Sequence, residues 1–307
     1  MFRIDPFGLG RGSGIESGKG QGVIDRMDGE GTVPKRPLGK TGEQVSIIGL
    51  GGEGILRTYG REEEAVSLIQ RAIDLGITYF ESANAYGGSE SYYGRALRER
   101  RKEIFLASKS HERTADGVLK HLETTLTNMK TSFLDLWMVH DVRSVNDLDQ
   151  IFGPAGAIKA FEIARQHRMV KWIGISGHRN PTILSRALSL FSFDTVLIPV
   201  NPAEWHYRSF LKEILPKAQK KEMGVLGMKV FSRGACFKIF ESESAGLFLR
   251  FALTQPITTV VVGCETVEQL EMNVRIAQAY QPMTEKEQEI MINKVKYYAR
   301  ELAYYKF

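Results

Sequence analysis

Short apolar runs alternate with stretches of helical length along most of the chain, and this alternation constrains the fold more than any other feature. The apolar runs predict strands over residues 45–50, 77–80, 104–107, 134–139, 172–175, 195–200, 225–230 and 259–262. The amphipathic stretches predict helices near residues 62–75, 89–100, 115–130, 154–168, 181–190, 209–222, 244–255 and 266–279, with a final helix over about 284–302. Apolar strands that are each followed by a helix pair in parallel. Eight such units close a (β/α)8 TIM barrel, and an open doubly wound α/β sheet is the alternative.

The first part of the chain differs from the rest in composition. Nine of the first 31 residues are glycine, and no helical or strand period is visible there. Residues 1–33 are therefore predicted to form a flexible glycine-rich tail, and residues 34–307 a single barrel domain. Turn residues between Arg36 and Gly42 predict a small β-hairpin ahead of the barrel.

Composition excludes several classes of function. The chain has only two cysteines, Cys236 and Cys264, so it supplies neither a disulfide framework nor a four-cysteine metal site. Its formal net charge is +5, and basic and acidic residues are interleaved, which does not indicate nucleic-acid binding. No apolar run is long enough to span a membrane, and no signal peptide is recognisable, so we expect a cytoplasmic protein.

Residues 49–54 match the pattern G-x-G-x-x-G after a predicted strand, and the next predicted strand ends at Glu81. This combination is typical of a Rossmann dinucleotide-binding fold. A Rossmann helix begins within the glycine motif, however, whereas here the helical pattern starts only near Glu62. The favoured interpretation is a glycine-rich strand end that a ligand or a neighbouring backbone approaches closely.

Four side chains that can carry charge or protons follow three of the predicted strands. They are Glu81 and Tyr86 after the second strand, Lys109 after the third and His140 after the fourth. The carboxyl ends of the strands form the active face of a TIM barrel. An ammonium close to a phenol would lower its pKa and favour proton transfer to a carbonyl oxygen, which an imidazole could orient. A hydride for such a reaction must come from a cofactor.

With these residues the sequence resembles the aldo-keto reductase superfamily over about residues 35–280. The matching segments are Arg36–Gly42, Gly49–Gly52, Gly76–Ala83, Tyr86–Gly87, Ser89–Glu90, Lys109, Asp135–His140, Gly174–Ser176 and Gly263–Leu270, ending at Asn273. The resemblance implies a (β/α)8 barrel that reduces the carbonyl group of a small molecule with NAD(P)H. It assigns Tyr86 as general acid, Lys109 as the partner that lowers its pKa, and His140 as the substrate-orienting imidazole. The family has an aspartate where this sequence has Glu81, which keeps the charge but adds a methylene.

The resemblance also implies a set of cofactor contacts, in which this sequence departs from the family pattern. Ser176 is kept but Gly177 follows it, Leu197 replaces a glutamine, and Met228 replaces the aromatic residue that stacks on the nicotinamide. The expected contacts are Gly51, Gly52, Ser176, Gly177, Met228, Lys229, Gly263, Cys264, Glu265, Gln269 and Asn273. NADP(H) is the family's usual cofactor. NAD(H) is possible because Glu265 would repel a 2′-phosphate and accept a hydrogen bond from a 2′-hydroxyl.

Two functional hypotheses follow. The first is an NAD(P)H-dependent carbonyl reductase, and the alternative is a nucleotide-binding regulatory or binding subunit with little turnover. The remaining histidines show no metal-ligand spacing, so no metal site is predicted; they are His111, His121, His167, His178 and His206. The Tyr304–Tyr305 pair is predicted to pack on the last helix, and a tail that covers the mouth of the site is the alternative.

Overall fold

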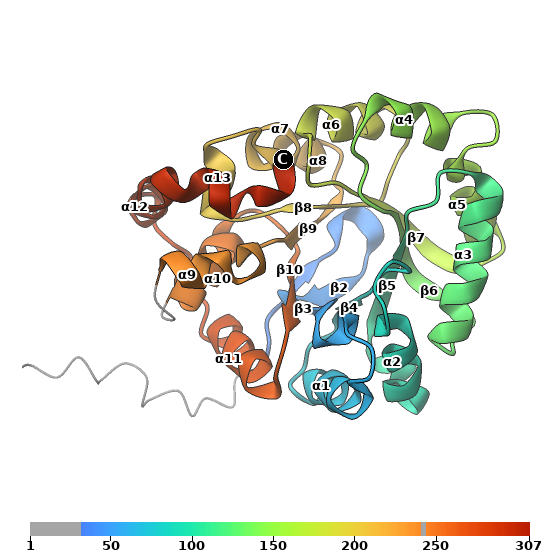
Figure 1. The fold of residues 1–307 in the computed structure, drawn as a ribbon, viewed down its shortest axis with the longest axis horizontal. Helices are drawn as coiled ribbons and strands as arrows, with labels where there is room; N and C mark the ends of the chain where they lie inside the picture. The colour runs from blue at the N-terminus through green and yellow to red at the C-terminus, as the bar shows by residue number, and fades with distance from the viewer. Residues whose placement is uncertain (1–31, 241–243) are drawn as a thin grey trace, which may run out of the picture. The chain divides into compact units, whose positions relative to one another are not determined.

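A computed structural model of the protein describes residues 32–240 and 244–307. Within these residues, eight parallel strands close into a barrel in the order β10, β3, β4, β5, β6, β7, β8, β9 (Figure 1). The strands are β3 (Ile48–Gly54), β4 (Tyr79–Glu81), β5 (Phe105–Ser110), β6 (Leu134–Val139), β7 (Val170–Ser176), β8 (Thr195–Pro199), β9 (Gly224–Met228) and β10 (Thr259–Cys264). The predicted (β/α)8 TIM barrel is therefore confirmed, and the open sheet is excluded.

Helices surround the strands (Figure 1). They are α1 (Glu62–Asp74), α2 (Ser89–Ala96), α3 (Ala115–Asn128), α4 (Val145–Phe152), α5 (Ala157–Gln166), α6 (Pro181–Leu190), α7 (Phe210–Glu213), α8 (Leu215–Lys220), α9 (Ala235–Ile239), α10 (Ser244–Thr254), α11 (Val267–Gln278), α12 (Glu285–Val295) and α13 (Ala299–Leu302). The short helix α4 was not predicted. The predicted helix 209–222 is divided at Ile214, because Pro216 cannot donate the next helical hydrogen bond and instead lies in the first turn of α8. The last helix is divided by a 3-10 turn at Lys296–Tyr298.

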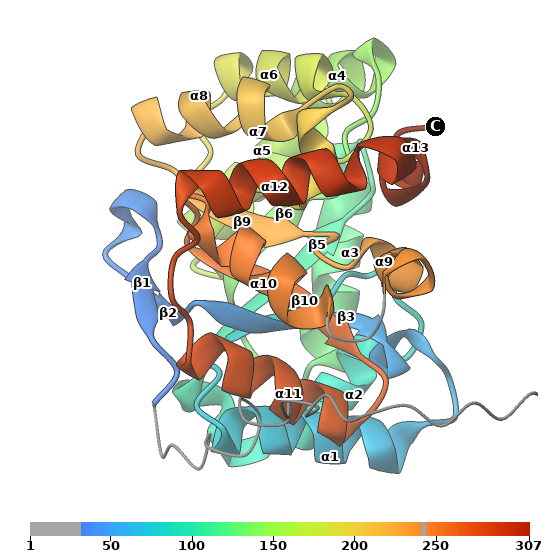
Figure 2. The same ribbon diagram turned by 90° about the vertical axis from the view of Figure 1, so that its left-hand side faces the viewer.

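The predicted hairpin is present as β1 (Lys35–Pro37) and β2 (Gln44–Ser46), which pair antiparallel. Its side chains Leu38 and Val45 are fully buried in the cluster that fills the barrel interior. Figure 2 shows the hairpin and α13 at opposite ends of the strands. The hairpin therefore closes the end of the barrel away from the expected active face.

The predicted strand 45–50 is in fact two strands, because the chain bends at Ile47. The Ser46 hydroxyl donates to the Ile48 carbonyl at 2.7 Å and accepts from the Thr78 amide at 2.9 Å. The Ile47 amide donates to the Pro34 carbonyl at 2.9 Å. These bonds fix the bend and separate the hairpin strand from β3.

The glycine motif lies inside β3 and its end, not at the start of a helix. Gly54 has φ +68°, and a Cβ built on it would lie 2.4 Å from the Cys264 carbonyl oxygen. A 3-10 turn, Ile55–Arg57, follows β3 directly. The Rossmann interpretation is therefore wrong, and the glycine permits a close approach of the neighbouring strand β10.

Residues 1–31 lie outside the described residues, so the flexible tail stays a prediction for that part of the chain. Val33 is 5% exposed and belongs to the outer hydrophobic core. The boundary after residue 33 stays a prediction. Among the described helices, none is long and apolar enough to cross a bilayer. The cytoplasmic location stays a prediction.

The C-terminal residues are held by a buried ion pair. Lys306 Nζ lies 2.8 Å from Glu204 Oε1, and neither side chain is exposed. The Tyr305 hydroxyl donates to Glu204 Oε1 at 2.6 Å, and the Phe210 amide donates to Glu204 Oε2 at 3.0 Å. Burial raises the pKa of Glu204 and lowers that of Lys306, which shows that the pair is held against the cost of desolvation.

Removing the lysine tests this anchor. We expect Lys306→Ala to lower the free energy of unfolding by about 3–5 kcal/mol, because Glu204 would stay buried without its partner. Urea unfolding of both proteins at pH 7 measures the difference. Lys296→Ala, which removes an exposed lysine of the same C-terminal region, is the control and should change stability little. Equal stability of the Lys306 variant and the wild type would show that the Lys306–Glu204 pair does not stabilise the fold.

Candidate active site

The four candidate catalytic residues meet at the carboxyl ends of β4, β5 and β6. Glu81 is the last residue of β4, Lys109 lies near the end of β5, and His140 follows β6. Lys109 Nζ donates to Glu81 Oε1 and, at 2.9 Å, to the Ser82 carbonyl. The Lys109 and Glu81 side chains are 1% and 5% exposed, so the longer glutamate does reach its partner in a dry environment.

Tyr86, in the loop after β4, lies between Lys109 and His140. Lys109 Nζ is 5.0 Å from the centroid of the Tyr86 ring, and the His140 ring contacts it edge-on with a centroid distance of 5.8 Å. Arg57 covers the Tyr86 ring at 5.0 Å from its centroid. Two cations, Lys109 and Arg57, and the imidazole of His140 therefore lie beside the Tyr86 ring.

The pKa of Tyr86 differs from the expectation that it would be lowered. Burial raises the pKa of Tyr86 well above its usual value, and the charges of Glu81 and Glu53 raise it further against Arg57 and Arg233. Lys109 is paired with Glu81, whose negative charge offsets the effect of the ammonium on the phenol. Burial and the charge of Lys109 lower the pKa of His140 well below its usual value. At neutral pH the site therefore holds a protonated phenol and a neutral imidazole.

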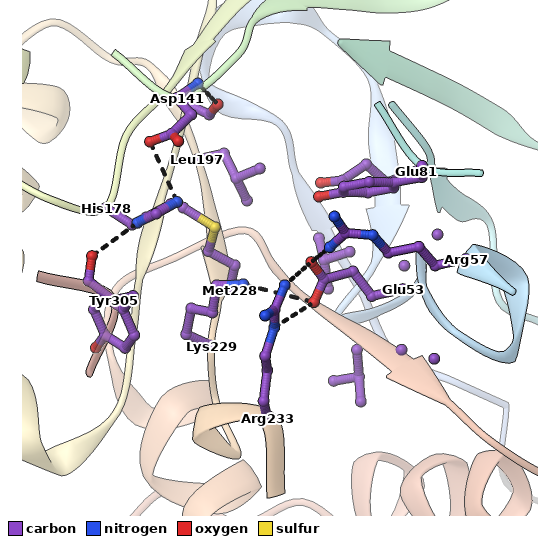
Figure 3. Close-up of a pocket in the computed structure, with 18 of the residues that line it drawn as sticks. Glu53, Arg57, Glu81, Asp141, His178, Leu197, Met228, Lys229, Arg233 and Tyr305 are labelled. Atoms are coloured by element: carbon purple, nitrogen blue, oxygen red, sulfur yellow. Dashed lines mark hydrogen bonds and ion pairs between the residues drawn. The ribbon is translucent and has the colours of Figure 1, made fainter. Parts of the chain in front are cut away.

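A second carboxylate, Glu53, gathers three cations at the mouth of the barrel (Figure 3). It lies 3.1 Å from Arg57, 3.6 Å from Lys229 and 3.0 Å from Arg233. Burial alone would raise the pKa of Glu53, but Lys229, the hydrogen bond from Arg233 and the charges of Arg233 and Arg57 lower it to about 2. We call these four residues the Glu53 cluster.

Of the Glu53 cluster, only Lys229 was predicted as a site residue. A signal was present in the sequence, because Glu53–Arg57 and Lys229–Arg233 are two pairs spaced by four residues, each at or just after the end of a strand. The sequence does not show that these two pairs come together in the folded chain.

A chain of polar contacts joins the loop after β6 to the C-terminal residues on the other side of the cavity (Figure 3). Asp141 Oδ1 lies 3.2 Å from His178 Nε2, and His178 Nδ1 lies 3.3 Å from the Tyr305 carbonyl. Burial opposes ionisation of Asp141, but His178 and Arg143 keep its pKa below the usual range.

Tyr304, Tyr305 and Phe307 line the cavity. The C-terminal residues therefore border the cavity, and the alternative in which they cover its mouth stays a prediction.

All these groups surround a cavity of about 1400 Å³, above the usual range of about 300–1,000 Å³ for ligand pockets. Glu81, Tyr86, Lys109 and His140 line it. Nine of the expected cofactor contacts also line it, namely Gly51, Gly52, Ser176, Met228, Lys229, Gly263, Glu265, Gln269 and Asn273. Two do not: Gly177 packs against Val142 and Leu184, and the Cys264 thiol is buried against Asn273.

The lining fits an anionic dinucleotide. Arg57, Lys229 and Arg233 are three cations at one part of the cavity, and cations of this kind bind phosphate oxygens. Asn273 Oδ1 is buried and has no hydrogen-bond partner among the described residues, so an acceptor is free beside the Gln269 end of the cavity. Leu197 and Met228 supply apolar surface for a ring.

A barrel with a buried lysine, a phenol and an imidazole at its strand ends defines a class of oxidoreductase, and comparisons with known proteins agree. The model of the aldo/keto reductase family matches residues 47–245. The chain therefore belongs to the aldo/keto reductase family, and it is an NAD(P)H-dependent oxidoreductase.

Individual relatives are similar over most of the barrel. The uncharacterized oxidoreductase YqkF of Bacillus subtilis is 26% identical over 298 residues, which covers 82% of this chain and 94% of that protein. The aldo-keto reductase yakc of Schizosaccharomyces pombe, named for NADP(+), is 28% identical over 64% of this chain and 57% of its own length. The crystal structure of an aldo-keto reductase from Klebsiella pneumoniae in complex with NADPH has a TM-score of 0.72 at 16% identity, covering 86% of this chain and 96% of that chain.

We expect the Glu53 cluster to make stability depend on pH. The pKa of Glu53 is lowered from 4.5 to about 2, so its contribution is fully present above about pH 4.5 and is lost as the pH falls toward 2. We expect Glu53→Gln to lower the free energy of unfolding by about 2 kcal/mol at pH 7, a value reduced for partial exposure. Urea unfolding between pH 7 and pH 3 should show this difference shrinking on acidification. Glu265→Gln, an exposed carboxylate of the same cavity, is the control, and a difference that does not change with pH would contradict the interpretation.

Proposed function

We propose that the protein reduces the carbonyl group of a small aldehyde or ketone with NADP(H), and that Tyr86 is the general acid. The observation that carries this proposal is that Glu81, Tyr86, Lys109 and His140 line one cavity. Family membership supports the reaction class.

The proton chemistry follows from the protonation states of the residues. The nicotinamide, when bound, supplies a hydride to the carbonyl carbon. Tyr86, whose raised pKa keeps it protonated, donates its phenolic proton to the carbonyl oxygen. His140, held neutral by burial, donates a hydrogen bond to the same oxygen and orients it. Lys109 lies within 5.0 Å of the ring centroid and stabilises the negative charge that Tyr86 gains on losing its proton.

The Glu53 cluster supports a proposed binding position for the cofactor's phosphates. Lys229, Arg233 and Arg57 would hold them, and Glu53 competes for the same cations. The relative named for NADP(+) and the similar structure in complex with NADPH support NADP(H). The ground for NAD(H) is Glu265, which is exposed at the edge of the cavity.

The role of Tyr86 is tested by removing only its hydroxyl. We expect Tyr86→Phe to lower kcat for a small aldehyde by about 10²–10⁴, because the general acid is lost. Nucleotide affinity should stay nearly unchanged. Aldehyde reduction followed by nicotinamide absorbance, and nucleotide binding followed by fluorescence, are the two measurements.

Tyr297→Phe is the matched control, because Tyr297 is 92% exposed and lies outside the cavity. A Tyr86→Phe variant that keeps most of its turnover would exclude Tyr86 as the acid. A wild type that binds nucleotide but reduces no aldehyde or ketone would favour the alternative of a binding or regulatory subunit.

The role of Glu265 is tested by reversing its charge. A 2′-phosphate carries nearly two negative charges, and its repulsion by Glu265 is weakened by solvent and salt. We therefore expect Glu265→Arg to raise the preference for NADPH over NADH by roughly ten-fold. Dissociation constants of both cofactors for both proteins measure the effect, and Glu265→Gln separates removal of the charge from its reversal. No change in preference on either substitution would show that Glu265 does not face the 2′ position.

A further inference from the structure

Two histidines and a glutamate form a cluster at the rim of the cavity. His111 and Glu112 lie in the loop between β5 and α3, and His121 lies on α3 (Figure 1). One ligand atom from each residue lies within 4.8 Å of the others. His121 Nε2 is 3.8 Å from Glu112 Oε1, and the two imidazole rings are 4.8 Å apart between centroids.

Ser110 holds the side chain of His121 and the backbone of Glu112 in position. Ser110 Oγ lies 2.9 Å from His121 Nδ1 and also accepts a hydrogen bond from the Glu112 amide at 3.2 Å. The tautomer that donates from Nδ1 to Ser110 leaves the Nε2 lone pair directed toward Glu112. Metal-binding histidines are commonly oriented in this way by a hydrogen bond from their other ring nitrogen.

The backbone leaves room for the carboxylate. Gly117 lies in the first turn of α3, and a Cβ at that position would lie 2.5 Å from Glu112 Oε2. The Glu112 carboxylate therefore occupies space that a larger residue would reduce. His111 is exposed, so its ring can rotate toward the other two ligands without disturbing the core.

We propose that His111, Glu112 and His121 bind a divalent transition-metal ion of the zinc class. Two imidazole nitrogens and one carboxylate oxygen suit zinc, cobalt, nickel or copper, whereas magnesium and calcium prefer oxygen ligands alone. Metal–ligand bonds of about 2.0–2.2 Å place ligand atoms up to about 4 Å apart, so small side-chain rotations close the site. The remaining coordination positions take solvent.

The site adjoins the catalytic cavity but does not depend on the proposed reduction. His111 lines the cavity and follows Lys109 by two residues. A bound ion would join the loop after β5 to α3 and add positive charge at the cavity rim near His111. The spacing of the ligands along the chain does not match a common zinc motif, and only the fold brings His121 back to the loop.

Metal binding by the full chain, without a histidine tag and after treatment with a chelator, tests the proposal. We expect one Zn²⁺ per chain by calorimetry, and a visible absorption band when Co²⁺ is added. His111→Asn, Glu112→Gln and His121→Asn should each weaken Zn²⁺ binding at least about ten-fold. Magnesium should not compete.

His167→Asn is the matched control, because His167 is exposed and lies outside the cluster. It should leave the affinity for Zn²⁺ unchanged. His111→Asn alters only an exposed side chain, so a loss of binding in this variant cannot come from unfolding of the core. A wild type that binds neither Zn²⁺ nor Co²⁺, or that binds them equally well after the three substitutions, would overturn the proposal.

Discussion

The pairing of β10 with β3 closes the barrel, and the arrangement of the site depends on it. The two strands run in parallel register from Val260 and Ile48 onward, and the register shifts between Val262 and Cys264, where Cys264 lies opposite Gly54. Gly54 and Gly263 allow this approach, because a Cβ on either would lie less than 3.0 Å from the other strand's backbone. Closure brings the loop after β3 toward the loop after β9, since β10 also pairs with β9. The Glu53 cluster is the direct consequence.

Two carboxylates of the site have different electrostatic roles. Glu81 is paired with Lys109 in a buried environment, which fixes the ammonium under the Tyr86 ring but cancels much of its effect on the phenol. Glu53 is only partly buried and faces three cations. These cations lower its pKa, so the carboxylate stays ionised at neutral pH. An arriving phosphate group would meet those same cations. The cluster therefore stabilises the folded chain with contacts that anion binding would have to share, as is common where function and stability use one set of side chains.

The sequence predicts the barrel and the gathering of the four candidate catalytic residues at one cavity, and for the same reason. Parallel strands end at one face, so residues such as Lys109 and His140 at strand ends must be neighbours once the strands pair. The contact of Glu53 with Arg233 could not be predicted, because it joins residues 180 positions apart and requires closure in the observed register. The C-terminal anchor is similar: the Lys306–Glu204 pair depends on where the last helices pack, which no local pattern specifies. Pro216 is visible in the sequence, but a single proline does not show whether a helix ends before it or only kinks.

Ser176 shows how a residue expected to contact the cofactor also has a role within the chain. Its hydroxyl donates to the Val139 carbonyl at 3.2 Å and accepts from the Asp141 amide at 2.9 Å. These bonds fix the backbone on both sides of His140, and Arg113 holds the same segment by donating to the His140 and Asp141 carbonyls. A hydroxyl has one donor and two acceptor positions, so one lone pair of Ser176 is left for a ligand. Ser176 can therefore accept a hydrogen bond from a bound group without releasing His140, but it cannot donate one.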